Sequence, residues 1–355
     1  MDVPDDDDAV SCMNGTHPRT ALIGNAADFQ DRSATAPRWE HQMLQDRLGA
    51  RLIATDQLGH GRLSHLRNRY LDIDRLWRLG ARLTRFDRLL AQSEASGYEA
   101  MLALSMRGTW RPLDIIFHGQ RWWTRRNRML GPLAGRLPHV RFLCLATSLR
   151  SILLEEYGVS PTRISVTGYG VDERFFRPER DAVPALVVSA GTASRDYRTL
   201  AAAAALISAP VRIAADSNWY RERLNVTEDA LPGNVRVASS ETYEALRALY
   251  ARALFVVVPL LDVRFACGYA VVAEAMAMGK PVIVTRTGAP GDLIEDGVTG
   301  LYVPPGDVDA LARTMNLLLL DPGRAQAMGV AARAAVEARM TLNLYVDRLT
   351  AAMRR

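Results

Sequence analysis

The stretch from Phe255 to Gly306 constrains the fold more than any other part of the chain. It opens with an apolar run at 255–260, rich in β-branched residues, which predicts a buried strand. A short apolar helix is expected over 271–278, and Gly279 ends it because glycine adopts the left-handed conformation easily. A further strand is expected at 282–285. Strand, loop, helix and strand in this order predict an open parallel sheet, in which ligands bind at the carboxyl ends of the strands.

One carboxylate, Glu274, interrupts the otherwise apolar helix AVVAEAMAM. A buried carboxylate needs a hydrogen-bond or charge partner. Glu274 can therefore accept hydrogen bonds from the hydroxyl groups of a ligand, or it can be paired within the protein for structural reasons. The residue type alone leaves both interpretations open.

The residues of this stretch also resemble a known family. The run GYAVVAEAMAMGKPVI, followed by GAPGDLIEDGVTGLYVPPGD, is similar to the nucleotide-sugar half of retaining glycosyltransferases of group 1, which include bacterial mannosyltransferases and sucrose synthase. The resemblance implies an α/β protein with the GT-B fold, in which two Rossmann-like, doubly wound domains face each other across a cleft. It identifies the chain as a divergent member.

The length of 355 residues fits about two domains. The resemblance implies an N-terminal, acceptor-side domain over 20–177 and a C-terminal, nucleotide-sugar-binding domain over 178–338. A last helix, 339–355, is expected to cross back to the first domain. The first residues, 1–19, are expected to be a disordered tail. Their acidic start is unlike the basic beginning of a signal peptide.

Arg195 follows the first strand of the expected second domain, in the turn GTASRDYRTL. Free N–H groups at a helix start favour anions, and a guanidinium beside them can hold a diphosphate. The resemblance gives basic residues of this turn that role, although Thr192 stands where the first of them is usual. A surface ion pair with Asp196 or Glu222 is the alternative. The donor-binding residues implied are Gly191, Thr192, Arg195, Gly268, Tyr269, Ala270, Val271 and Glu274.

His118 directly follows an expected strand, 113–117, and so lies at the mouth of the first sheet. The resemblance implies that a histidine here lies between the domains, near the transferred sugar. A surface or core histidine is the alternative. The catalytic residues implied are therefore His118, Arg195 and Glu274.

The sequence departs from the family pattern at several positions. Ala266 stands eight residues before Glu274, where the family often has a second glutamate. The loop 264–270 is therefore expected to hold the sugar mainly through backbone groups, or Asp262 or Arg264 takes over.

Two further departures lie outside this loop. Tyr169 replaces an asparagine in the junction segment GYGVDERFFRPER, and residues 25–28 replace a Gly-Gly turn. Together with Thr192 and Ala266, these departures keep open a catalytically inactive relative that binds a nucleotide sugar or a partner enzyme.

A basic, aromatic segment, GQRWWTRRNRML, follows His118. Arginines beside tryptophans can bind an anionic membrane surface or an acceptor phosphate. The alternative is a solvated basic helix whose tryptophans pack inward. An apolar run of about 18 residues, as a membrane span requires, is absent. The net charge of +5 raises nucleic acid as a partner, but no nucleic-acid-binding pattern supports it. We expect a cytoplasmic protein, peripheral on the inner face of the membrane through Arg121, Trp122, Trp123, Arg125, Arg126 and Arg128.

No metal and no cofactor other than the donor are expected. The cysteines are too few and scattered for a zinc site or a disulfide framework. Asp72 and Asp74 form an Asp-x-Asp pair, but the pair precedes a helical pattern and is interpreted as a solvated helix face.

The resemblance implies transfer of a sugar, with retention, to a lipid, polysaccharide or small molecule. The leaving phosphate then helps to deprotonate the acceptor. An epimerase is an alternative. A phosphorylase is disfavoured because the only lysine, Lys280, follows the end of a helix and does not resemble a pyridoxal site.

Overall fold

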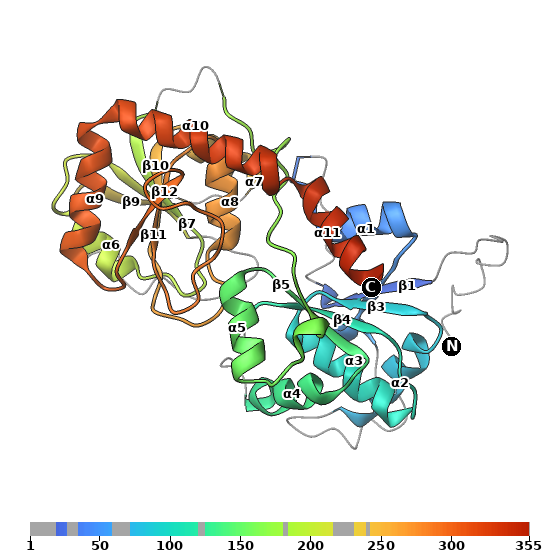
Figure 1. Ribbon diagram of the computed structural model, residues 1–355. Coiled ribbons are helices and arrows are strands. Elements are labelled where there is room, and N and C mark those ends of the chain that lie inside the picture. Colours follow the sequence, from blue (N-terminus) through green and yellow to red (C-terminus); the bar gives the residue numbers. More distant parts are fainter. Residues whose placement is uncertain are drawn as a thin grey trace, which may run out of the picture.

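The computed structural model describes residues 19–26, 35–58, 72–119, 125–179, 184–215, 231–238 and 242–354. Within these residues the chain forms two sheets, each of six parallel strands flanked by helices (Figure 1). The predicted α/β architecture of two doubly wound domains is therefore confirmed.

The first sheet has the strand order β2-β1-β3-β4-β5-β6. Every residue of β1 and β4 is buried, and these strands are mostly apolar. The buried carboxylate of Asp114 in β4 is paired with Arg141 at 2.7 Å. The strands are β1 (Thr20–Gly24), β2 (Arg51–Ala54), β3 (Arg88–Ala91), β4 (Leu113–Phe117), β5 (Val140–Cys144) and β6 (Ile164–Val166). The helices are α1 (Glu40–Leu48), α2 (Ile73–Leu83), α3 (Glu94–Met106), α4 (Arg125–Arg136) and α5 (Thr147–Glu155), with short 3₁₀ turns at Thr55–Gln57 and Pro161–Arg163.

The second sheet has the order β12-β11-β10-β7-β8-β9, so the chain changes direction across the sheet between β7 and β10. Ligands of doubly wound folds bind beside such a switch point. The strands are β7 (Leu186–Ala190), β8 (Val211–Ala214), β9 (Val235–Ala238), β10 (Ala253–Val258), β11 (Val282–Thr285) and β12 (Gly300–Val303). The helices are α6 (Tyr197–Ala204), α7 (Tyr243–Ala251), α8 (Tyr269–Ala277), α9 (Val308–Leu320) and α10 (Pro322–Arg339).

The last helix, α11 (Leu342–Arg354), packs beside α1 of the first domain (Figure 1). Arg47 of α1 donates to Asn343 Oδ1 at 2.8 Å and forms an ion pair with Asp347. Arg141 of β5 donates to the carbonyl of Met353 at 3.1 Å. The C-terminal helix therefore lies on the first domain, whereas the exact domain bounds remain a prediction.

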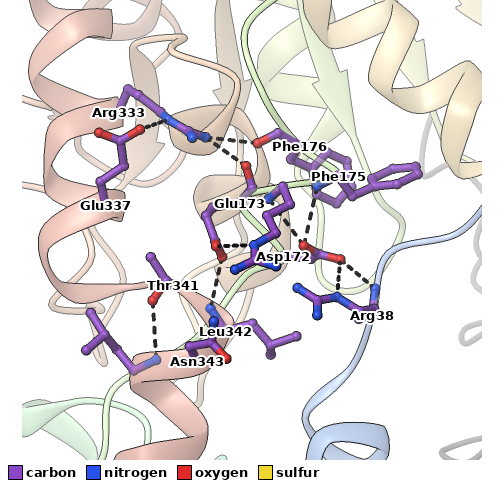
Figure 2. A network of polar contacts seen from close by, with 12 residues as sticks. Arg38, Asp172, Glu173, Phe175, Phe176, Arg333, Glu337, Thr341, Leu342 and Asn343 are labelled. Atoms are coloured by element: carbon purple, nitrogen blue, oxygen red, sulfur yellow. Dashed lines mark hydrogen bonds and ion pairs between the residues drawn. The ribbon is translucent and has the colours of Figure 1, made fainter.

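The chain passes between the domains in a crossover segment, residues 171–176, which is held by polar contacts (Figure 2). Asp172 is buried and accepts hydrogen bonds from the backbone N–H groups of Arg38 at 2.8 Å and of Arg174 at 3.2 Å. Arg333 of α10 donates to the carbonyls of Glu173, at 3.1 Å, and of Phe176, at 3.0 Å. The crossover is therefore fixed to both domains.

The domains also meet at the N-terminus of α5, whose N-cap residue, Ala146, has no side chain that can accept a hydrogen bond. Asp292 of the second domain supplies the missing acceptor. Its Oδ2 accepts from the backbone N–H of Thr147 at 2.7 Å and from the Thr147 hydroxyl at 2.8 Å. Ser148 Oγ donates to the carbonyl of Pro290 at 2.7 Å. One domain thus caps a helix of the other.

The Asp-x-Asp pair is structural, but the expected solvated helix face is wrong, because Asp74 is buried and only 6% exposed. Asp72 is the N-cap of α2 and accepts from the N–H of Arg75 at 3.0 Å. Asp74 pairs with Arg78 at 3.1 Å. Among the described residues, no helix combines the length and the apolar character needed to span a bilayer.

We expect Asp292→Ala to remove the cap of α5. The loss should cost about 0.5–2 kcal/mol of unfolding free energy, the usual value of an N-cap, and the first-turn amides of α5 should exchange faster with deuterium. Hydrogen exchange resolved by mass spectrometry measures this. Asp307 caps α9 within the second domain, accepting from Ala310 N at 2.8 Å, and is the matched control. Asp307→Ala should leave exchange at α5 unchanged. Equal exchange at α5 in both variants would contradict the inter-domain cap.

Candidate functional site

Two loops at the carboxyl edge of the second sheet form one unit. They are the β7–α6 loop, 191–196, and the β10–α8 loop, 259–268. The backbone N–H of Asp196 donates to the carbonyl of Pro259, and that of Leu261 donates to the carbonyl of Ser194, both at 3.0 Å. The predicted donor-binding residues lie in these loops and in the first two turns of α8, so the fold brings them together.

Arg195 is buried, with 6% of its surface exposed, and its guanidinium braces the β7–α6 loop. Nε donates to the carbonyl of Ala190 and Nη1 to that of Ala193, both at 2.9 Å. This position does not fit the alternative of a surface ion pair with Asp196, whose carboxylate caps α6 by accepting from Thr199 N at 3.1 Å. Glu222 lies outside the described residues. A role for Arg195 toward a diphosphate stays a prediction.

The same loop contains strained and unsatisfied groups. Ser194 is the only non-glycine residue with a positive φ, 52°, within the described part of the chain. Thr192 is 9% exposed, and its Oγ1 has no hydrogen-bond partner among the described residues. Backbone strain and a buried hydroxyl without a partner both cost free energy, and both are frequent where a ligand binds. Gly191 has a φ of +88°, and a Cβ there would lie 2.6 Å from Arg195 Nη2.

Glu274 is 7% exposed and receives a hydrogen bond from another helix. The hydroxyl of Tyr250, in the last turn of α7, donates to Glu274 Oε2 at 3.0 Å. Burial, and then the negative charge of Glu274, raise the pKa of Tyr250 well above its usual value, so the phenol keeps its proton. The positive charge of Arg195 acts on the same phenol in the opposite direction. The buried tyrosine is therefore bonded to Glu274 and lies within electrostatic range of Arg195.

Residues at the start of α8 are mostly committed to packing. Gly268 is the N-cap of α8 and has a φ of +77°. This φ and the lack of space favour glycine, since a Cβ would lie 2.9 Å from Val258 Cγ1. Tyr269 is buried and meets the ring of Tyr169 edge-on, with centroids 6.1 Å apart. Val271 is buried and Ala270 is half-buried. The backbone N–H groups of this first turn are what α8 offers to an anion.

His118 lies at the junction of the two domains. Its backbone N–H donates to Glu94 Oε1 at 3.1 Å, and its Nδ1 is 3.4 Å from Glu94 Oε2. Its carbonyl accepts a hydrogen bond from Ala266 N, across the junction, at 2.7 Å. The histidine is thus beside the loop that faces it from the second domain, as its place after β4 suggested.

The loop that lacks the second glutamate is held by protein contacts. The N–H of Ala266 is bonded to His118, so this backbone group is occupied in the present conformation. Arg264 pairs with Glu156 of the first domain at 2.9 Å. Asp262 Oδ1 accepts from Gly288 N at 2.9 Å. Each residue expected to replace the missing acid therefore already has a structural partner.

Sequence reasoning missed Tyr250 and Glu94, the residues that hold Glu274 and His118. Glu94 is 1% exposed and opens α3 directly after the N-cap Ser93. Acidic residues are common in the first turn of a helix because they interact favourably with the helix dipole. The sequence therefore gave no sign that Glu94 contacts His118. Tyr250 lies in an ordinary amphipathic pattern.

Other predicted residues lie partly outside the described structure. Residues 121–123 are not described, and Arg125 and Arg126 are described only as part of the backbone of α4. Arg128 is exposed on α4. The predicted membrane or phosphate contact of this segment therefore stays a prediction. No group of three or more His, Cys, Asp or Glu residues that could hold a metal ion is found within the described ranges.

Comparison with known proteins gives a family for the second domain. Residues 181–321 match the model of the glycosyl transferases group 1. The chain is 27% identical over 240 residues to an MMP alpha-(1->4)-mannosyltransferase of Mycolicibacterium hassiacum, covering 62% of this chain and 56% of that protein. It is 48% identical over 60 residues to a GDP-mannose-dependent alpha-(1-6)-phosphatidylinositol monomannoside mannosyltransferase of Mycolicibacterium smegmatis, covering 17% and 16% of the two chains.

The chain thus spans about half the length of the first of these curated relatives, and less of the second. Among solved structures, Anabaena Alr3699/HepE in complex with UDP and glucose superimposes with a TM-score of 0.71 at 17% identity, covering 94% of this chain and 91% of that one. The structural likeness confirms the expected GT-B fold.

We expect Gly191→Ala to destabilise the protein more than Gly158→Ala. Both glycines have a positive φ, which costs a non-glycine residue about 1–2 kcal/mol. A Cβ at Gly158 meets no atom within 4 Å, whereas one at Gly191 collides with Arg195. Urea unfolding of the two variants measures the difference. Equal losses would show that Arg195 moves aside freely and does not brace the loop.

Proposed function

We propose that the chain transfers a sugar from a nucleoside-diphosphate sugar to an acceptor, because residues 181–321 match the model of the glycosyl transferases group 1. The observation that carries the proposal is the convergence of Glu274 and Arg195. Glu274 lies on α8 and is bonded to Tyr250, and Arg195 lies in the β7–α6 loop, where its Nη1 is 3.7 Å from Sγ of Cys267, just before α8. Doubly wound sheets bind nucleotides at the carboxyl edge of their strands, where the β7–α6 loop lies.

In the proposed reaction the donor diphosphate lies at the N-terminus of α8 and the β7–α6 loop. The N–H groups of Tyr269, Ala270 and Val271, together with the Arg195 guanidinium, oppose the charge that develops on the leaving diphosphate. Preorganised dipoles and cations of this kind give the largest single contribution to many such reactions. Glu274 accepts hydrogen bonds from the ribose hydroxyls.

The finer features of the reaction follow from the resemblance. We propose retention at the anomeric carbon, with the leaving phosphate deprotonating the acceptor and His118 beside the transferred sugar. A pair of carboxylates of the glycosidase type is then unnecessary. The proposed reaction uses no metal and no cofactor other than the donor.

The relatives suggest which donors to test. The Mycolicibacterium smegmatis relative is named for its use of GDP-mannose, and solved neighbours hold UDP, glucose or UDP-glucose. We therefore propose a GDP- or UDP-hexose as donor and a lipid, polysaccharide or small molecule as acceptor. A thermal-shift screen of these nucleotide sugars tests binding, because a ligand of the native state raises Tm.

A second candidate function is a catalytically inactive protein that binds a nucleotide sugar or a partner enzyme. The occupied N–H of Ala266 favours it, because the loop that faces the sugar lacks both the acid and this backbone donor. Binding without turnover would support this candidate. Release of an epimerised free sugar without acceptor would instead indicate an epimerase.

At donor concentrations below KM, we expect Glu274→Gln to lower donor turnover about 10- to 100-fold through a higher KM, the usual loss for a hydrogen bond to a charged group, with the fold retained. Donor-dependent release of nucleoside diphosphate measures it, and NMR of the glycoside product gives the anomeric configuration. Glu244, exposed on α7, is the matched control, and Glu244→Gln should keep full turnover. Unchanged turnover in Glu274→Gln would remove Glu274 from the site.

We expect replacement of Trp122 and Trp123 by Ala to abolish binding to anionic vesicles, because indole rings and arginines suit the headgroup region. Co-sedimentation with phosphatidylglycerol vesicles measures it. Trp110, which is 55% exposed elsewhere on the first domain, is the matched control. If the double variant still binds and Trp110→Ala does not, the membrane-binding surface lies elsewhere.

A further inference from the structure

We propose that Tyr250 is a positioning residue, which fixes the carboxylate of Glu274 in the orientation that binds the donor. The inference rests on the proposed function, since it assigns Tyr250 a role through Glu274 and not a contact with the substrate. It is carried by a hydrogen bond between two buried side chains of different helices.

The hydrogen bond fixes the carboxylate plane. A carboxylate on a flexible side chain can turn about its last torsion, which is broad and has no sharp minimum. The phenol of Tyr250 donates to Oε2 at 3.0 Å and so selects one orientation. Because the hydrogen bond is made to a charged group, it is stronger than a neutral one.

The ring of Tyr250 cannot move away from this position easily. It is fully buried, and it packs against the ring of Phe176 with centroids 6.3 Å apart and an interplanar angle of 59°. Phe176 is in turn held by its carbonyl, which accepts from Arg333. Packing therefore fixes the position of the Tyr250 hydroxyl. A residue that orients a functional carboxylate must itself be held in place in this way.

The surroundings make the phenol a permanent donor. Burial and Glu274 raise its pKa, so that Tyr250 remains protonated at neutral pH. The positive charge of Arg195 acts on the pKa of Tyr250 in the opposite direction. A single hydroxyl group is thus bonded to the carboxylate proposed for the ribose and lies within electrostatic range of the guanidinium proposed for the diphosphate.

Tyr250→Phe tests the proposal because it keeps the ring and removes the donor. We expect the Kd for GDP or UDP, whichever binds the wild type, and the KM for its hexose donor to rise about 10- to 100-fold, the usual loss for a hydrogen bond to a charged group. We expect kcat to change less, because a ribose contact acts equally in the ground and transition states.

A double-mutant cycle with Glu274→Gln separates positioning from a structural role. If Tyr250 acts through Glu274, the double variant should bind the nucleotide no more weakly than Glu274→Gln alone. Tyr302→Phe is the control, since it loses only the bond from its hydroxyl to the carbonyl of Gly291, at 3.0 Å, and should keep the KM of the wild type.

The outcomes are distinct. A lower Tm with unchanged KM and Kd in Tyr250→Phe, or full additivity in the cycle, would overturn the positioning role. If Glu274→Gln itself leaves nucleotide binding unchanged, or no nucleotide binds the wild type, the proposed donor site fails and the inference falls with it.

Discussion

The guanidinium of Arg333 is the contact on which the arrangement of the site depends. Its Nη1 donates to the carbonyls of Glu173 and Phe176 (Figure 2). It also donates to the carbonyl of Ala277 at 2.7 Å. Carbonyls at the end of a helix have no partner within the helix, so Ala277, the last residue of α8, needs one from outside. One side chain of α10 thereby joins the crossover between the domains to the helix that carries Glu274.

Several contacts between the domains near the site are polar. They include the cap that Asp292 provides for α5, the bond from Ala266 to His118, and the ion pair of Arg264 with Glu156. Water can replace such bonds at a net cost of only about 0.5–1.5 kcal/mol each. Apolar residues of both domains also belong to one buried cluster, and the ring of Tyr169 packs against those of Tyr269 and Tyr345. Polar and apolar contacts together therefore hold the two domains against each other.

The sequence predicted the parts that depend on local patterns. The apolar strands, the helix that bears Glu274 and the glycine at its end all lie where the periodicity placed them. The partners of the predicted site residues could not be predicted in this way. Tyr250 meets Glu274, and Glu94 meets His118, only after separate strands have paired, so no spacing in the chain encodes these contacts. Arg195 was predicted at a helix mouth, and its burial among loop carbonyls depends on how the loop folds.

The replacement of an acid by Ala266 has a structural consequence. An acid here would carry a charge toward the domain junction, where Glu94 already holds His118. With alanine the loop approaches the first domain closely. A Cβ on Gly119, which has a φ of +80°, would lie 3.2 Å from the Cα of Phe265 and 2.9 Å from a methyl of Leu149. The hydrogen bond from Ala266 N to the His118 carbonyl also joins this loop to the first domain. In the proposed reaction, the N–H groups that begin α8 serve the diphosphate, so recognition of the sugar falls to groups such as the hydroxyl of Thr192, because the facing loop is used to join the domains.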